Sequence, residues 1–438
     1  MGIQFSTDSF QVARLIPVTG IKGALDQERR SSSALLAVMK IVPEFAQALM
    51  KEAGAPKGSI ETFIEPEFKL GSKKIRPDGL IVIRRGAREW RALVEVKTGK
   101  NDLELEQINS YLDICKEYKL EALITLSNEV LNASGAHPTA GIDARRLRAT
   151  HLEHLSWLKV LTEAIVLSEH VGVEDTERDM VLKELIRYLQ ADSSGASEFN
   201  DMGVGWTRVR DQIRAATIRK PDQDVLDTVA NFESLVRYAS LTLSARLGVK
   251  AREVIPKAAK SNYRSHLAAA GQHLIDTKCL IGAITVPGAA AKMDLVADLG
   301  SGLLQCESTV PAPLEGRNKS RINWAVRQLL HKPDGLTLSW TYKHSRVREQ
   351  PHAVVDLLDK SYDFEVLSDR EISAFTVNMM TKMGSKRAAG AGGFIDSVVS
   401  IFEMFYGQVL EDFRPWQNPA PKLSDSVKEL IPEQTSQD

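Results

Sequence analysis

Two strand-like segments, residues 75–84 and 90–98, are separated by only five residues that include Gly86. A short, glycine-containing connection between two such segments predicts a β-hairpin. A turn centred between Gly86 and Ala87 pairs residues whose numbers sum to 173, so Asp78 lies opposite Glu95. This register constrains the fold strongly, because it fixes two carboxylates on neighbouring strands with Cβ atoms about 4.5–5.5 Å apart.

The segments around this hairpin alternate between helical and strand-like periodicity. Helices are expected over residues 25–50, with a kink at Pro43, and over 102–118, 158–169 and 176–189. Further strands are expected over residues 60–68, 121–126 and 149–155. Helix, hairpin, helix and strand in this order predict an α/β unit, a mixed sheet flanked by helices.

The chain has 438 residues, enough for two to four domains. A Ser- and Gly-containing stretch after residue 191 predicts a linker over 193–200, which closes a first domain over 1–192. We expect a mainly helical segment over 201–270 and an α+β domain of unknown role over 271–414. Residues 415–438 contain several prolines and polar residues and are expected to form a flexible tail.

The composition is that of a soluble globular protein, with 43% hydrophobic and 26% charged residues. Cys115, Cys279 and Cys306 lie far apart, which argues against a disulfide framework and a structural zinc site and suits a reducing compartment. No apolar run approaches the 18 residues of a membrane span. We therefore expect a cytoplasmic protein without membrane partners, and leave a homo-oligomer open.

The predicted pairing of Asp78 with Glu95 has chemical consequences. Adjacent carboxylates repel unless a cation lies between them or one is protonated. Carboxylate and water oxygens are the ligands that Mg²⁺ and Mn²⁺ prefer. Lys97 shares a strand face with Glu95, where it could orient or deprotonate a water for attack on a phosphodiester. The alternative is a surface hairpin in which Lys97 only neutralises the two acids.

Pro77-Asp78 and the following Glu95-Val96-Lys97 resemble the motif of the PD-(D/E)xK nuclease superfamily. Ten residues after Lys97, Gln107-Ile108-Asn109-Ser110-Tyr111 resembles the QxxxY motif of its RecB-like members. The resemblance covers roughly residues 20–170. It implies a restriction-endonuclease-like fold in which Asp78, Glu95 and the carbonyl of Val96 hold Mg²⁺ or Mn²⁺ and Lys97 positions the attacking water.

The resemblance also implies roles for three residues outside the hairpin. Glu28 would be the acid that many members carry on the helix before the hairpin, while Gln107 and Tyr111 would brace the site or contact the substrate backbone. The residues also allow simpler interpretations. An acid such as Glu28 is favoured at the start of any helix, and Gln107 and Tyr111 could be a surface residue and a core residue one turn apart.

Residues 317–348 are rich in Lys and Arg, with Asp334 as the only acid, and contain Trp324, Trp340 and Tyr342. Such a stretch can neutralise phosphates and stack on bases, or it can be a solvated basic face above buried aromatics. The candidate nucleic-acid-binding residues are Arg317, Lys319, Arg321, Arg327, Lys343 and Arg346. A net charge of −1 does not exclude a polyanionic substrate, because an acidic C-terminal region offsets this stretch.

The expected function is therefore a metal-dependent nuclease, acting on DNA or alternatively on RNA, of a kind that suits restriction, repair or phage defence. The remainder of the chain would supply recognition, allostery or oligomerisation. The alternative is a nuclease-like fold that binds nucleic acid or regulates without cleaving it. A third hypothesis is that the C-terminal half senses a ligand or a partner protein.

Overall fold

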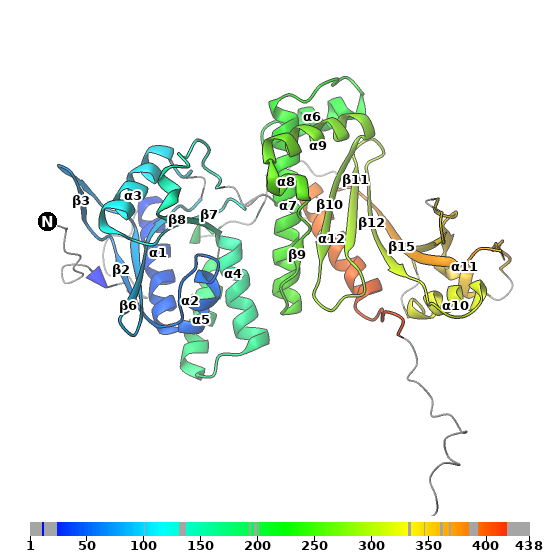
Figure 1. The fold of residues 1–438 in the computed structure, drawn as a ribbon, viewed down its shortest axis with the longest axis horizontal. Helices are drawn as coiled ribbons and strands as arrows, with labels where there is room; N and C mark the ends of the chain where they lie inside the picture. The colour runs from blue at the N-terminus through cyan, green and yellow to red at the C-terminus, as the bar shows by residue number, and fades with distance from the viewer. Residues whose placement is uncertain are drawn as a thin grey trace, which may run out of the picture.

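The computed structural model describes residues 11–12, 24–99, 101–130, 137–191, 194–196, 199, 201–331, 334–345, 347–359, 362–367, 369–384 and 393–417. These residues form a mixed α/β structure with two open sheets and their flanking helices, one in each of two units (Figure 1). The α/β class expected from the sequence is thereby confirmed.

The first unit is built around a six-stranded mixed sheet in the order β1-β2-β5-β6-β7-β8. The first four strands pair antiparallel, and β7 and β8 add in parallel. The parallel strands β6, β7 and β8 therefore end at the same edge of the sheet. The strands are β1 (Gln11–Val12), β2 (Ser59–Ile64), β5 (Gly79–Arg85), β6 (Arg88–Val96), β7 (Ala122–Ser127) and β8 (His151–Ser156).

Helices cover both faces of this sheet, because successive strand residues point to opposite sides. Val94 and Val96 join a core with the first set of helices, whereas Leu93 joins a second core with α3 (Leu105–Tyr118). The first set comprises α1 (Ala24–Ile41), α2 (Pro43–Met50), α4 (Trp157–Ile165) and α5 (Thr176–Gln190). The kink expected at Pro43 is a complete break, with a bend of 112° between α1 and α2.

The strand expected over 60–68 ends earlier than expected, and the strand expected from residue 75 begins later. β2 ends at Ile64, and Glu65 adopts a left-handed φ of 46°, which interrupts an extended strand. After this break, β3 (Phe68–Leu70) and β4 (Lys73–Ile75) pair as a separate two-stranded sheet. β5 therefore begins at Gly79 instead of residue 75.

The second unit contains a seven-stranded antiparallel sheet in the order β14-β13-β15-β12-β11-β10-β9. The sequence analysis placed no strand at β15, the longest of them, which lies between β12 and β13. The strands are β9 (Arg252–Glu253), β10 (Cys279–Thr285), β11 (Met293–Asp298), β12 (Leu303–Pro311), β13 (Leu336–Tyr342), β14 (His352–Ala353) and β15 (Ile372–Lys382).

The helices of the second unit share one core with this sheet. Val209, Phe232 and Leu274 lie in the same cluster as Leu295 and Phe375 of the strands. The helices of 201–270 therefore share a hydrophobic core with the strands of 271–414. The helices are α6 (Trp206–Arg214), α7 (Gln223–Leu247), α8 (Lys257–Ser261), α9 (Tyr263–Thr277), α10 (Asn318–Gln328), α11 (Val354–Leu358) and α12 (Phe394–Phe405).

The two units contact each other through α4 and α7, which lie side by side at the centre of Figure 1. Lys250 Nζ forms an ion pair with Glu163 at 2.7 Å, and Thr162 Oγ1 donates to the carbonyl of Leu241. Of the expected linker, the described residues 194–196 are anchored to the first unit: Ser194 is buried and its carbonyl accepts from Ser31 Oγ. Residues 418–438 of the expected tail lie outside the described residues.

Within the described ranges, no helix taken singly has the length and hydropathy of a membrane span; only α1 and α2 considered together, across their bend, pass that test.

Candidate active site

The β5–β6 hairpin has the register expected from the sequence. Its ladder runs from Arg85 opposite Arg88 to Gly79 opposite Val94, so each pair sums to 173. Asp78 directly precedes this ladder. Its Oδ2 accepts a hydrogen bond from the Val96 N–H at 2.7 Å, which fixes the carboxylate at the end of β6.

Lys97 lies directly after β6, and its side chain points to Glu95. Nζ is 2.8 Å from Glu95 Oε1, and the two side chains are 16% and 2% exposed. The main chain of Lys97 is held on two sides: its N–H donates to the carbonyl of Leu126 at 2.7 Å, and its carbonyl accepts from Trp157 Nε1 at 2.9 Å. The ammonium group is therefore presented from a fixed backbone.

Glu28 approaches the same end of the hairpin from α1 and is buried. Its Oε1 accepts from Asn101 Nδ2 at 2.6 Å and from the Thr98 N–H at 3.5 Å. Glu28 is thus held against the loop that follows Lys97, where its charge acts on both Asp78 and Lys97. The linker reaches this loop as well, because the Gly99 N–H donates to the carbonyl of Gly195 at 2.9 Å.

Gln107 and Tyr111 lie one turn apart on α3 and are joined by a hydrogen bond of 2.9 Å from Gln107 Nε2 to the tyrosine hydroxyl. Tyr111 is buried in the α3 core, as the simpler interpretation expects. Burial, with the nearby charge of Glu95, raises the pKa of Tyr111, so its hydroxyl stays protonated. The geometry thus places the pair beside Glu95, within the first unit.

Among the described residues of this site, the three acids Asp78, Glu95 and Glu28 act on the ammonium of Lys97. Burial and the charge of Glu95 raise the pKa of Asp78 well above its usual range, although the hydrogen bond from the Val96 N–H lowers it. Burial alone would lower the pKa of Lys97, but Glu95 and the other two acids raise it. Glu95 Oε2 is buried and, in the part of the chain that the structure describes, has no hydrogen-bond partner.

These donors fit a hard divalent cation held by few protein ligands. Among the described residues, no group of three or more His, Cys, Asp or Glu side chains is arranged to hold a metal ion. The candidate donors are Asp78, Glu95 and the carbonyl of Val96. In an extended strand, the N–H and C=O of one residue point to the same side, so this carbonyl points toward Asp78 as its N–H does. Mg²⁺ characteristically binds through few carboxylates and keeps several waters.

A polar row that the sequence analysis did not recognise extends from the site across the sheet. Glu95 pairs with Thr125 of β7, and Thr125 pairs with His154 of β8. Thr125 Oγ1 lies 2.8 Å from His137 Nε2 and 3.0 Å from His154 Nδ1. Burial lowers the pKa of each histidine to about 4, so both are neutral at pH 7. The available sign was Thr125, a polar residue between the apolar residues Ile124 and Leu126 of β7.

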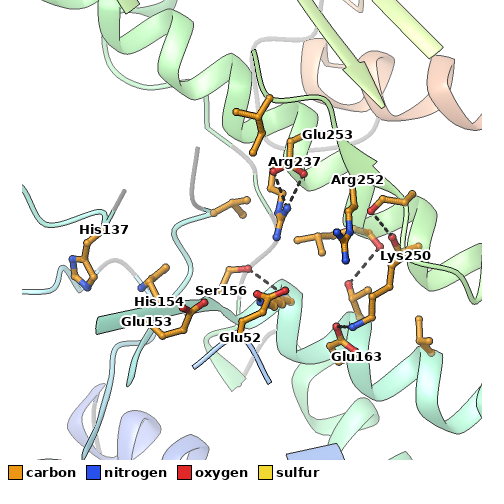
Figure 2. A pocket seen from close by; sticks show the side chains of 18 of the residues that line it. Glu52, His137, Glu153, His154, Ser156, Glu163, Arg237, Lys250, Arg252 and Glu253 are labelled. Atoms are coloured by element: carbon orange, nitrogen blue, oxygen red, sulfur yellow. Dashed lines mark hydrogen bonds and ion pairs between the residues drawn. The ribbon is translucent and has the colours of Figure 1, made fainter. Parts of the chain in front are cut away.

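This row leads to a cleft of about 370 Å³ between the two units (Figure 2). His154 and Lys159 line it from the first unit, and Arg237, Lys250 and Glu253 line it from the second. Acids and bases are paired here: Lys159 with Glu52, Arg237 with Glu253 and Lys250 with Glu163. The cleft is therefore a charged contact between the units without a marked excess of one sign.

The candidate nucleic-acid-binding residues of the basic stretch differ in their exposure. Arg321 is only 3% exposed, and its guanidinium donates to the carbonyls of Gly316, Ile372 and Leu314, so it is unavailable to a phosphate. Lys343 forms an ion pair with Glu371. Arg317, Lys319 and Arg327 are exposed, and Arg346 lies outside the described residues.

Two aromatic residues of this stretch are buried, as in the alternative interpretation of a solvated basic face above buried aromatics. Trp340 and Tyr342 are buried, so they cannot stack on bases. Trp324 packs against Phe375 and Phe413. Figure 1 places α10, which carries Arg321 and Arg327, at the end of the second unit that faces away from the β5–β6 hairpin.

Comparison of this chain with protein-family models, with curated proteins and with solved structures gives no significant match.

Proposed function

We propose that the first unit is a metal-dependent nuclease that hydrolyses phosphodiester bonds with Mg²⁺ or Mn²⁺ bound at the end of the β5–β6 hairpin. The observation that carries the proposal is the geometry at Glu95. This buried carboxylate is paired with Lys97, and the N–H of the next residue, Val96, donates to Asp78. Among the described residues, one oxygen of Glu95 has no hydrogen-bond partner. The resemblance of residues 77–78, 95–97 and 107–111 to the PD-(D/E)xK pattern supports the same function.

Each residue of the site would have a separate task. Asp78, Glu95 and the Val96 carbonyl would hold the cation, which supplies charge neutralisation for the phosphate and lowers the pKa of a bound water. Lys97, already a hydrogen-bond donor to Glu95, would orient the attacking water and stabilise negative charge on the phosphate oxygens. Glu28 and the Gln107–Tyr111 pair would position the loop after Lys97 and the carboxylate of Glu95.

The substrate proposed is DNA, with RNA as the alternative. A direct test incubates the purified protein with plasmid DNA, single-stranded DNA and RNA, each with Mg²⁺, Mn²⁺ or EDTA. We expect cleavage with either metal, none in EDTA, and a loss of at least about 100-fold in Lys97→Ala. Lys116→Ala, an exposed lysine of α3, is the matched control and should cleave as the unaltered protein does.

The two possible failures have different meanings. Equal cleavage by Lys97→Ala and the unaltered protein would refute the role of Lys97. Absence of cleavage of all three substrates with both metals, together with retained binding to any of them, would favour the non-cleaving nucleic-acid-binding module.

A further inference from the structure

The two-stranded ribbon formed by β3 and β4, residues 68–75, leaves the first sheet beside Asp78 and returns to it there. β2 and β5 pair as far as the last residue of β2 and the first of β5, and beyond this point the Glu65 N–H donates to the carbonyl of Asp78 at 3.0 Å. Ile75, the last residue of β4, lies three residues from Asp78, so their Cα atoms are at most about 11 Å apart.

The ribbon lies on the same side of the sheet as the carboxylates of the candidate site. Leu93 joins the core with α3, and Glu95 shares its strand face. The charges of Glu95 and Asp78 both act on Tyr111 of α3. Three apolar side chains of the ribbon pack against this same core: Phe68, Leu70 and Ile75.

Contacts at both ends fix the ribbon in place. Phe68 is buried, and its ring meets the ring of Tyr118 of α3 edge-on, with centroids 5.0 Å apart. The Tyr118 hydroxyl also donates to the carbonyl of Lys69 at 3.1 Å. At the base, Arg29 of α1 donates from Nε and Nη2 to the two carboxylate oxygens of Glu65 at 2.7 and 2.6 Å. The ribbon is therefore preorganised for binding.

The ribbon carries positive charge that does not stabilise its own pairing. Residues 67–76 hold one acid and four basic side chains: Lys69, Lys73, Lys74 and Arg76. Lys69 and Lys74 are direct cross-strand partners, and like charges in this position destabilise a sheet. The acid, Glu67, pairs with Lys74 at 2.8 Å. Lys69 and Lys73 are exposed and form no ion pair within the described residues.

The turn at the tip of the ribbon is open to a large partner. Gly71 has a φ of 61°, which a two-residue hairpin turn requires. Apart from its chain neighbours, no atom of the described residues lies within 4 Å of the position that a Cβ on Gly71 would take. Figure 1 shows β3 beside α3, at the end of the first unit that is far from the second.

Duplex DNA is the polyanion that this ribbon fits best. The major groove of B-form DNA admits a two-stranded β-ribbon between rows of phosphates, whereas the major groove of A-form RNA is deep and narrow. Proteins that hold single strands stack the bases on aromatic side chains. The one aromatic side chain of residues 68–75, Phe68, is instead buried in the core.

We propose that the β3–β4 ribbon is a DNA-binding arm whose lysines contact backbone phosphates of duplex DNA a few base pairs from the bond that is cleaved. A distance of about 11 Å corresponds to about three base pairs at 3.4 Å each. The proposal rests on the proposed nuclease function, because it names the substrate contact beside that site.

The first experiment measures binding of the full chain to a short fluorescent DNA duplex by anisotropy, in EDTA and at several salt concentrations. The test variant combines Lys69→Gln with Lys73→Gln. The control combines Lys40→Gln with Lys51→Gln, exposed lysines of α1 and the end of α2 across the sheet. At about 0.1 M salt the dissociation constant should rise at least about tenfold in the test variant only, and the slope of log K against log salt should fall by about 2.

A conservative pair of substitutions separates loss of charge from loss of structure. Lys69→Arg with Lys73→Arg should retain binding and the salt slope, because both positive charges remain. Equal binding by the test and control variants, or no binding of the duplex by the unaltered protein, would overturn the proposal. A loss of affinity for single-stranded DNA or an RNA duplex that equals or exceeds the loss for the DNA duplex would also overturn it.

Cleavage with Mg²⁺ separates a failure of this proposal from a failure of the nuclease function. In the test variant, KM for duplex DNA should rise on the order of tenfold with kcat little changed, because the lysines contact phosphates other than the one attacked. Cleavage with an unchanged KM would refute the role of the ribbon alone. Binding that depends on the ribbon lysines, without cleavage by the unaltered protein, would refute the nuclease function and leave the ribbon as a DNA-binding arm.

Discussion

Replacing Asp78 by Asn should stabilise the first unit in the absence of metal while abolishing cleavage. Asp78 accepts a hydrogen bond from the N–H of Val96, next to Glu95, and continuing the hairpin register by one residue would set the Cβ atoms of Asp78 and Glu95 about 5 Å apart. Two charges at that distance repel by about 3 kcal/mol at an effective dielectric constant near 20. The asparagine still accepts from the Val96 N–H, although a neutral acceptor is weaker by about 1 kcal/mol. Loss of the attraction between Asp78 and Lys97 reduces the gain further, so we expect Asp78→Asn to raise the free energy of unfolding of the first unit by about 1–2 kcal/mol.

Hydrogen-exchange mass spectrometry of peptides that cover β5 and β6 measures this change, because it reports the free energy of opening of the first unit separately from the second. In EDTA, Asp78→Asn should show the slower exchange. Adding Mg²⁺ should slow exchange in the unaltered protein and have little effect in the variant, since binding to the native state stabilises it. Asp334→Asn, in an exposed turn of the second unit, is the control. Faster exchange in Asp78→Asn in EDTA, or the same response to Mg²⁺ as in the unaltered protein, would refute the reasoning.

Two further predictions concern stability. The folded-state pKa values of His137 and His154, about 4, lie below the unfolded value of about 6.5, so stability is complete above pH 6.5 and falls toward pH 4. At pH 5 each histidine should lower the free energy of unfolding, measured with urea, by about 2 kcal/mol relative to pH 7. His154→Gln should remove the part of this loss that is due to His154, whereas His151→Gln should leave the loss unchanged. A free energy of unfolding that does not change between pH 7 and pH 5 would contradict this. Arg321→Ala should destabilise the second unit by about 2–4 kcal/mol, whereas Arg327→Ala on the same helix should change its urea midpoint little; equal effects would refute the structural role of Arg321.

The local part of the candidate site could be predicted from the sequence. The distance in sequence between Asp78 and Glu95, together with a turn around Gly86, is enough to set the hairpin register, because a two-residue period admits few alternatives. The position of Glu28 needed the additional knowledge that α1 lies beside the hairpin. Its partner Asn101 and the contact of Gly195 with Gly99 depend on how loops close in three dimensions, which periodicity does not encode.

Non-local features of the second unit could not be predicted in the same way. β15 inserts between β12 and β13, two strands that precede it in the chain, so its place in the sheet depends on contacts distant in sequence. Arg321 and Trp340 show the same limit for single residues. A basic or aromatic residue has the same letter in the sequence whether it faces solvent or is buried against carbonyl groups and other rings.

Glu253 of the two-residue strand β9 lines both the charged cleft between the units and a largely apolar cavity of about 580 Å³ between α7, α9 and β10. Its carboxylate is held by Arg237 of α7, the helix that also contacts the first unit. A molecule that moves β9 when it enters the cavity would change the free energy of contact between the units. Because coupling between two binding events is reciprocal, a ligand that shifts the first unit would change the affinity of the cavity for its own molecule by the same factor. Because Glu253 of β9 lines both the cavity and the cleft, binding in the second unit could alter the contact with the first unit directly.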